Sequence, residues 1–369
     1  PSFLQNISYK FDCMFMTLSV VFAIYPFLFF KNKKLFYIHS VFGLILTMMT
    51  YQASVCIWLV LFFYLSFRGR LSPFCVEKNF FKTSFISLCL CGAVCVFTFL
   101  ITDHFNHNGW VKSHSRLCSF SNCPQVILQN FNTLTDYMFS HWSSSVLGAF
   151  FVILLLVFSA HLIFLSIQLK SNLSKTDNVL FGIGTVSLML CSVIVWTLFF
   201  TRLVLEPRIL IGFGCVVSVM LLDCSLISSK IIRRVVFVFS FLLIWQLFIF
   251  TARYGNLLVA QRQYEVYFFS RLATQIDEHH VSQIYIKPGK LQAPLVKIKA
   301  EKHPLYNHLI FFHLEQPSWP YDYLNVLMGA NVRPCSNKKQ EQQTVLYTSD
   351  LFSLIKINNT CIQVSFSKL

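Results

Sequence analysis

The chain has 369 residues, of which 55% are hydrophobic and only 12% are charged, and it contains 41 phenylalanines. This composition excludes an ordinary water-soluble domain and indicates a protein whose surroundings are mostly lipid. The net charge of +15 does not imply a nucleic-acid partner, because about twelve of the 30 lysines and arginines belong to connections expected in the cytoplasm, where anionic lipid head groups meet them. The sequence also has no arginine-rich or aromatic-interleaved stretch typical of nucleic-acid binding.

About eight apolar runs, each of about 16 to 25 residues, follow one another along the chain, and a helix needs about 20 residues to cross the hydrocarbon core. Backbone amides in lipid must be paired within their own segment, so each run is predicted to be a helix. The runs cover residues 12–30, 35–50, 52–67, 83–102, 144–168, 178–201, 208–227 and 235–253. The sequence therefore predicts an α-helical polytopic membrane domain over residues 1–254.

Basic residues occupy every second connection between these runs. They are Lys31, Lys33 and Lys34 after the first run, Arg68, Arg70, Lys78 and Lys82 after the third, Lys170 and Lys175 after the fifth, and Lys230, Arg233 and Arg234 after the seventh. The positive-inside rule places these four connections in the cytoplasm. Residues 1–10, the large loop 103–142 and the chain after residue 254 are then expected on the outer face.

The apolar stretch 35–67 decides whether this orientation holds. A single tilted helix of about 33 residues would be about 50 Å long and would invert everything that follows. A hairpin at residues 50–53 instead keeps both Lys33 and Arg70 inside. We therefore predict the hairpin.

Loop 103–142 is too long for a simple connection. We expect a short surface helix at Val126–Phe131, with Trp110, Tyr137 and Trp142 in the interfacial zone. Two interpretations stay open for this loop: a solvated interfacial segment, or a lid over a substrate cleft.

The chain after residue 254 changes character, with more charge, more proline and shorter apolar runs. Residues 255–369 are predicted to form a small soluble α/β domain. Its first helix has Leu257, Tyr264, Phe268 and Leu272 on one face, with Arg262, Glu265 and Arg271 elsewhere around it, and ends at Asp277–His280. Strands are expected at residues 282–286, 344–348 and 360–366.

Most of the thirteen cysteines fall inside the apolar runs, where a thiol is a small apolar filler. Two pairs lie outside, Cys118 with Cys123 and Cys335 with Cys361, and the sequence leaves open whether they form disulfides. No zinc-type spacing is present. We expect no structural metal.

Carboxylates near the outer ends of the runs are rare, and they are Asp12, Asp103, Asp136 and Glu206. Asp12 is either a helix-start acid or a catalytic group. Arg202 and Arg208 flank Glu206, and these three either neutralise one another or the arginines bind a lipid phosphate. Asp223 and His161, near cytoplasmic helix ends, are interpreted as packing groups.

Three stretches carry a family resemblance. Residues 1–12, PSFLQNISYKFD, precede a methionine-containing run that ends in Tyr25-Pro26-Phe27. Residues 50–54, TYQAS, and the strand at 284–286 continuing to Pro294 are the second and third. With these stretches, the chain resembles the type II serotype-converting O-antigen glucosyltransferases of enterobacterial phages and prophages.

This resemblance implies a multi-span enzyme of the bacterial inner membrane, with its soluble domain in the periplasm. The enzyme would move glucose from polyprenyl phosphoglucose to lipid-linked O-antigen by a single inverting displacement, without an assigned cofactor. It points to Asp12 for catalysis and to Tyr51 and Gln52 for substrate binding, whereas Arg202 and Arg208 come from the electrostatic argument alone. The chain opens with Pro1 rather than Met and reads as a fragment, so the family's principal acidic motif is expected upstream of Pro1.

Two other classes of function remain. A transporter or flippase of lipid-linked sugars would favour internal repeats and spans broken around polar sites at mid-membrane, and neither pattern is found. An O-antigen polymerase would share the lipid substrates and the large outer loop.

Overall fold

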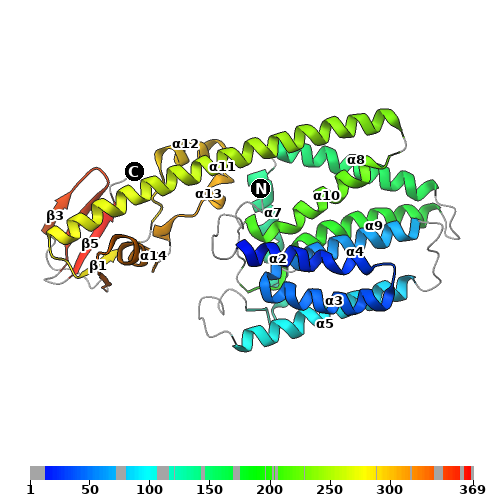
Figure 1. The fold of residues 1–369 in the computed structure, drawn as a ribbon, viewed down its shortest axis with the longest axis horizontal. Coiled ribbons are helices and arrows are strands. Elements are labelled where there is room, and N and C mark those ends of the chain that lie inside the picture. Colours follow the sequence, from blue (N-terminus) through cyan, green and yellow to red (C-terminus); the bar gives the residue numbers. More distant parts are fainter. Residues whose placement is uncertain are drawn as a thin grey trace. The chain divides into compact units, whose positions relative to one another are not determined.

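The computed structural model describes residues 13–71, 80–105, 116–119, 121–142, 146–168, 175–195, 197–201, 203, 207–227, 229–287, 289–315, 318–335, 344–357 and 361–366. The chain divides into two compact units, Pro1–Thr251 and Ala252–Leu369 (Figure 1).

The first unit is a bundle of helices. In chain order its elements are α2 (Cys13–Ile24), η1 (Tyr25–Phe29), α3 (Lys33–Thr50), η2 (Gln52–Ser54), α4 (Val55–Leu71), α5 (Phe80–Phe105), α7 (Cys123–Trp142), α8 (Val146–Gln168), α9 (Lys175–Ile194), η3 (Thr197–Phe199), η4 (Pro207–Leu210), α10 (Ile211–Ser225) and the first part of α11 (Lys230–Glu278). Helices α2 and α5 pack against α3, while α9 and α10 pack against α4 and α8.

Five helices among the described residues are long and apolar enough to cross a membrane. These segments are Gln52–Gly69, Gly148–Gln168, Thr176–Ile194, Arg208–Ser225 and α11. Two shorter apolar helices, Cys13–Phe29 and Phe85–Ile101, coincide with further predicted runs. The prediction of a helical membrane protein is confirmed, but the count of eight spans is not. The remaining run, 35–50, forms α3, which begins with two lysines.

Small residues allow the helices to approach one another closely. A Cβ on Gly43 would meet the backbone oxygen of Phe22 at 2.7 Å, and a Cβ on Gly212 would meet the Cys56 sulfur at 2.5 Å. Such contacts replace the hydrophobic driving force that is missing between helices in lipid. Large apolar side chains such as Phe237 remain exposed on the outside of the unit, as expected of a lipid-facing surface.

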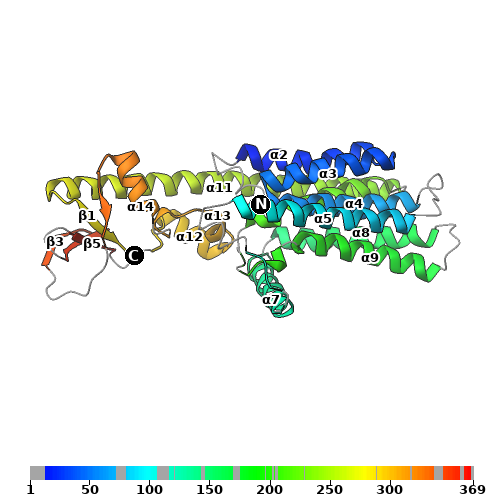
Figure 2. The same cartoon turned by 90° about the horizontal axis from the view of Figure 1, so that it is seen from below.

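The predicted hairpin at residues 50–53 is confirmed. Helix α3 ends at Thr50, Tyr51 is extended with φ −156° and ψ 101°, and α4 begins at Val55. The chain reverses direction there (Figure 1). As a result, the start of α3, the end of α4 and the starts of α9 and α11 lie at one end of the bundle (Figures 1 and 2). We call this the basic end, because these helix ends carry Lys33, Arg68, Lys175 and Lys230.

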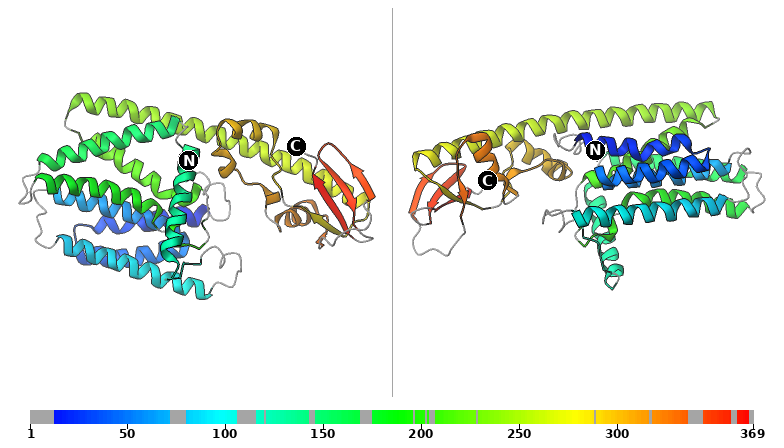
Figure 3. Two further views of the ribbon diagram at one scale, coloured as in Figure 1. Left: turned by 180° about the vertical axis from the view of Figure 1, so that it is seen from behind. Right: turned by 60° about the horizontal axis from the view of Figure 1, so that its bottom comes forward.

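Helix α7 crosses the direction of the other helices at the opposite end of the bundle (Figures 2 and 3). The prediction of a short helix at Val126–Phe131 was too narrow, because the helix spans 20 residues, Cys123–Trp142. Asn130, Leu134 and Tyr137 recur at helical spacing and are buried, while Leu128 and Phe131 are exposed. This periodicity extends the helix beyond the segment that hydrophobicity alone indicated.

The second unit combines the end of α11 with a five-stranded sheet. Its other elements are β1 (Gln283–Ile286), α12 (Pro294–Lys302), α13 (Tyr306–Leu309), η5 (His313–Glu315), α14 (Trp319–Asp322), η6 (Tyr323–Leu327), β2 (Arg333–Pro334), β3 (Thr344–Thr348), β4 (Phe352–Lys356) and β5 (Cys361–Phe366). The strand order is β2-β1-β5-β4-β3. Strand β1 pairs in parallel with β2 and β5, whereas β4 pairs antiparallel with β5 and β3.

One face of α11 covers the core of this sheet. Phe268, Phe269 and Leu272 of α11 are fully buried among Leu354 and Val364. The predicted apolar face of this helix is therefore confirmed, and so is its end at Glu278. Strands β1, β3 and β5 match the predicted ones, while β2 and β4 were not predicted.

Both cysteine pairs left open by the sequence form disulfides. Cys118 bonds to Cys123 with a Cα–Cα distance of 5.1 Å. Cys335, which follows β2, bonds to Cys361 at the start of β5, with a Cα–Cα distance of 6.3 Å. The other described cysteines are free thiols in the helices of the first unit.

Candidate functional site

The end of the bundle opposite the basic end, which we call the loop end, joins segments that lie far apart in the sequence. Leu117 forms an antiparallel bridge with Phe200. The Cys118 amide donates to the carbonyl oxygen of Phe199 at 2.8 Å, and the Thr201 amide donates to that of Arg116 at 2.9 Å. Segment 116–119 is therefore held against η3 and the residues that follow it.

Asn130 fixes α7 to the same place. Its buried side-chain amide donates to the carbonyl oxygens of Leu198 and Phe200, at 3.0 and 2.8 Å. The Cys118–Cys123 disulfide ties the start of the helix to segment 116–119. Helix α7 is thus an ordered part of the loop end, which a simple solvated loop would not be.

Tyr51 and Gln52 lie in the hairpin at this end, and both side chains are half-buried. The Ser54 amide closes the turn on the Tyr51 carbonyl oxygen at 3.0 Å. The Ser54 hydroxyl shares a buried hydrogen bond of 2.7 Å with the Ser19 hydroxyl of α2. The turn is therefore anchored to a neighbouring helix.

The structure brings this turn together with Arg208. Element η2 packs against η4 and against the start of α10, and η4 carries Arg208 as a half-buried side chain. Three of the five predicted site residues thus lie in two adjacent segments, although about 156 residues separate Gln52 from Arg208 in the sequence.

The two other predicted site residues, Asp12 and Arg202, are not placed by the structure. Asp12, Arg202 and Glu206 lie outside the described residues. Asp103 belongs to α5, and Asp136 is exposed on α7. The catalytic role of Asp12 therefore stays a prediction.

A charged cluster that the sequence did not predict lies at the basic end. Asp223 of α10 is fully buried, and its Oδ1 accepts a hydrogen bond of 2.7 Å from the Tyr64 hydroxyl. The Arg68 Nε lies 3.3 Å from the same oxygen, and the His161 Nε2 lies 3.5 Å from Oδ2. The cluster joins α4, α8 and α10, so the interpretation of Asp223 and His161 as packing groups is confirmed.

A signal for this cluster was present in the sequence. A carboxylate inside an apolar helix needs a partner, and Tyr64 and Arg68 are one turn apart on the same face of α4. The sequence does not show, however, that this face of α4 lies against Asp223 of α10, because that contact depends on how the helices of the bundle pack.

A second buried acid lies in the carboxyl-terminal unit. Sequence analysis placed Glu265 away from the apolar face of α11, but the residue is only 2% exposed. Its Oε2 lies 2.8 Å from the His313 Nδ1, and its Oε1 accepts from the His313 amide and from the Gln261 side chain.

Aromatic rings surround this pair. The His313 ring lies 5.0 Å from that of Tyr323, and Phe311 stacks obliquely on Trp319 at 4.3 Å. Burial raises the pKa of Tyr323, and the nearby Glu265 carboxylate raises it further. The arrangement satisfies a buried carboxylate and orders the chain between α13 and η6.

Among the described residues, no three His, Cys, Asp or Glu side chains are close enough together to hold a metal ion. Neither the loop end nor the Glu265 pair therefore offers a described metal site. The predicted site residues that the structure describes at the loop end are a guanidinium, an amide and a phenol, in Arg208, Gln52 and Tyr51.

Comparison with known proteins identifies the first unit. The family model described as "Glucosyl transferase GtrII" matches residues 1–220, which is more than half of the chain. No curated protein and no solved structure matches. The match covers η2, α7, η4 and most of α10, so every segment of the loop end lies inside it, whereas α11 and the carboxyl-terminal unit lie outside.

Proposed function

The chain belongs to the glucosyl transferase GtrII family, and we propose that it transfers glucose from polyprenyl phosphoglucose to a lipid-linked O-antigen at the periplasmic face of the bacterial inner membrane. Membership confirms the resemblance on which sequence analysis relied and supports a glycosyltransferase. The five apolar helices support a membrane-embedded one. The identity of the donor, the identity of the acceptor and the side of the membrane on which transfer occurs are the parts that we propose.

Charge and cysteine chemistry support this sidedness. Basic helix ends gather at one end of the bundle, which the positive-inside rule assigns to the cytoplasm. The Cys118–Cys123 disulfide lies at the opposite end, and disulfides persist in oxidising compartments such as the periplasm. The charge distribution and the disulfide both support a periplasmic loop end.

The contact between η2 and η4 is the observation that carries the proposed chemistry. It supports a common site for the hairpin turn of Tyr51 and Gln52, which the family resemblance indicated, and the η4 segment of Arg208, which was chosen on charge alone. The phosphate of a polyprenyl donor lies at the level of the lipid head groups, where these segments would meet it. Arg208, with Arg202, would neutralise the phosphate as it leaves.

The reaction is a single displacement. An acceptor hydroxyl attacks the anomeric carbon, the bond from that carbon to the phosphate oxygen breaks, and the hydroxyl proton passes to a carboxylate. Asp12 is the proposed acceptor of this proton. Tyr51 and Gln52 would hold the sugar by hydrogen bonds. The product has inverted configuration, and no covalent glycosyl-enzyme forms.

The proposal is tested with membranes that carry the full chain, labelled polyprenyl phosphoglucose and lipid-linked O-antigen. Label should enter polysaccharide. Arg208→Ala should reduce the rate of glucosyl transfer by about 100-fold, as expected for loss of a charge that stabilises the leaving group. Arg208→Lys keeps the charge and should retain part of the wild-type rate.

Two results would contradict the proposal. Movement of lipid-linked sugar across a proteoliposome membrane without a new glycosidic bond would indicate a flippase. Elongation of O-antigen without incorporation of the label would indicate a polymerase.

A further inference from the structure

The carboxyl-terminal unit contains a cavity of about 370 Å³ that neither the family match nor the proposed reaction uses. Its walls come from α11, from α12 and from the chain leading into α13. The lining residues are Arg253, Asn256, Leu257, Leu295, Lys299, Lys302, His303 and Tyr306. We call it the basic cavity.

The charge of the lining is positive only. Arg253, Lys299 and Lys302 are exposed and, within the part of the chain that the structure describes, make no ion pair. No acid is among the lining residues, and Glu301, next to Lys302, is not one of them. Cations that share a cavity repel one another. This arrangement favours an anionic ligand.

Helix geometry explains only part of this charge. Lys299 and Lys302 lie in the last turn of α12, where cations stabilise a helix through its dipole. Arg253 comes from a different helix and gains nothing from that dipole. Burial raises the pKa of Tyr306, and the Arg253 guanidinium lowers it, so Arg253 acts on the part of the cavity formed by α13. The helix dipole therefore does not explain why basic side chains from both α11 and α12 line the same cavity.

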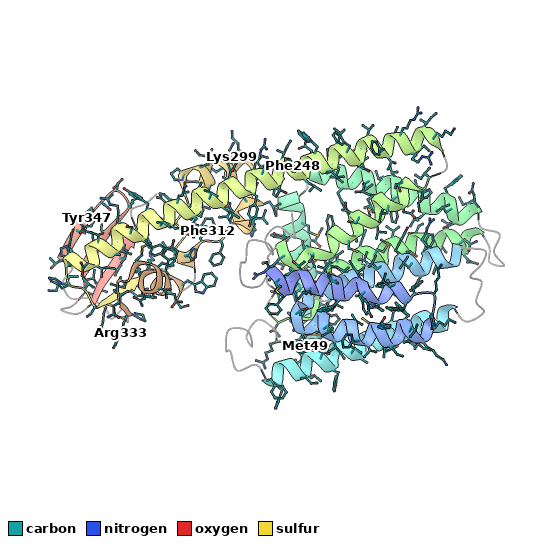
Figure 4. All side chains as sticks on the ribbon, viewed as in Figure 1. Met49, Phe248, Lys299, Phe312, Arg333 and Tyr347 are labelled. Atoms are coloured by element: carbon teal, nitrogen blue, oxygen red, sulfur yellow. A yellow bond between two sulfur atoms is a disulfide. The ribbon has the colours of Figure 1, made fainter. Side chains whose placement is uncertain are left out.

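Apolar surface beside the basic residues indicates that the anionic group belongs to a lipid. Arg253 follows directly on the apolar part of α11, where Phe248 is 66% exposed. On α12, Leu295 lines the cavity and is 47% exposed, and Ile298 is 53% exposed (Figure 4 labels Phe248 and Lys299). Long basic side chains next to the end of an apolar helical stretch reach the head-group level of a membrane on either side.

We propose that the basic cavity binds the phosphate of a membrane lipid. Arg253, Lys299 and Lys302 contact the phosphate oxygens, and Leu257 and Leu295 contact the first carbons of the lipid chain. A polyprenyl phosphate and an anionic phospholipid present the same chemistry, and the experiment distinguishes them. This site is separate from the Arg208 segment at the loop end.

The first test measures how fast an amine-reactive acetylating reagent modifies individual lysines of the full chain in a phosphate-free maltoside detergent. Polyprenyl phosphate, phosphatidylglycerol and inorganic phosphate are added in separate arms. A bound phosphate should slow modification of Lys299 and Lys302 by about tenfold, because it engages their amines. Lys297, exposed on the same helix and outside the cavity lining, should keep its rate.

Each outcome has a defined meaning. Protection by polyprenyl phosphate alone supports the proposal and identifies that lipid, while protection by phosphatidylglycerol supports it with a phospholipid as the ligand. Protection by inorganic phosphate without protection by either lipid overturns the assignment to a lipid. Equal protection of Lys297, or no protection in any arm, overturns the site itself.

Variants give the second test. The double variant Lys299→Ala/Lys302→Ala should weaken binding of the protecting lipid by about tenfold or more, whereas Lys297→Ala should leave it unchanged. A cooperative thermal unfolding transition at the wild-type temperature would show that the double variant folds. If the folded double variant bound the lipid with wild-type affinity, the proposal would be refuted. Arg208→Ala should reduce transfer by about 100-fold and leave this binding intact, so failure of the proposed reaction is distinguishable from failure of this site.

Discussion

At the scale of single residues, the few charged side chains of the helical bundle have two kinds of role, one in packing and one proposed in ligand binding. Asp223 is buried, and Tyr64, Arg68 and His161 surround it. Burying a carboxylate without such partners costs several kcal/mol, so its role is to hold α4, α8 and α10 together. Arg208 is a half-buried side chain of η4, which packs against the hairpin turn at the other end of the bundle, and it is the residue proposed to bind the phosphate of the donor.

The Asp223 cluster gives the first prediction. Asp223→Ala should destabilise the folded protein by about 3 kcal/mol, because it leaves Arg68 without its buried partner. Tyr64→Phe removes one hydrogen bond to a charged group and should cost about 1.5 kcal/mol. Thermal unfolding in detergent measures both. A larger effect of Tyr64→Phe than of Asp223→Ala would contradict the assignment.

Asp12 gives the second prediction at this scale. If it accepts the proton of the acceptor hydroxyl, Asp12→Asn should reduce glucosyl transfer by about 100-fold or more. Membrane insertion should be unchanged, because an amide is no harder to accommodate at a helix start. Wild-type transfer by this variant would leave Asp12 only a role in starting the first helix.

At the scale of elements, α7 shows how one hydrogen-bonded side chain can fix a helix. Its amphipathic pattern predicts a surface helix, but the pattern does not show where the helix is attached. Attachment comes from Asn130, whose side-chain amide donates hydrogen bonds to the carbonyl oxygens of Leu198 in η3 and of Phe200 just after it.

Asn130→Ala therefore gives the third prediction. The substitution leaves two carbonyl oxygens without their donor and should cost about 1 to 3 kcal/mol. Amide hydrogen exchange in residues 197–201 and in α7 should accelerate, and transfer should fall if α7 closes over the substrate. Asn132→Ala, an exposed position on the same helix, serves as the matched control. Equal exchange in the two variants would show that Asn130 does not anchor the helix.

At the scale of the whole molecule, each unit has a feature that indicates the side of the membrane on which it lies. The first unit has the basic helix ends at one end and the Cys118–Cys123 disulfide at the other. The second unit has the Cys335–Cys361 disulfide. Both disulfides require an oxidising compartment, so the loop end and the carboxyl-terminal unit are proposed to share the periplasm.

The fourth prediction tests this sidedness. A carboxyl-terminal reporter that functions only in the cytosol should stay inactive, and one that needs periplasmic oxidation should be active. In the same cells, Cys335 and Cys361 should react with a maleimide only after reduction. A functional cytosolic reporter would overturn both the topology and the proposed site of transfer.

The sequence by itself determined the features that depend on local pattern: the apolar helices, the hairpin at Tyr51, the end of α11 at Glu278 and strands β1, β3 and β5. It also determined the family, because residues 1–220 carry the family's pattern. Each of these depends on the order of residues within about one helix or strand length, and apolar periodicity reports that order directly.

Only the tertiary structure decided which distant segments meet. Tyr64 and Asp223 are 159 positions apart, and η2 meets η4 across α5, α7, α8 and α9. Glu265 was misjudged for the same reason, since its partner His313 lies 48 positions away. The basic cavity likewise joins α11 to α12. Pairings of this kind depend on how whole helices pack, and no local pattern encodes that packing.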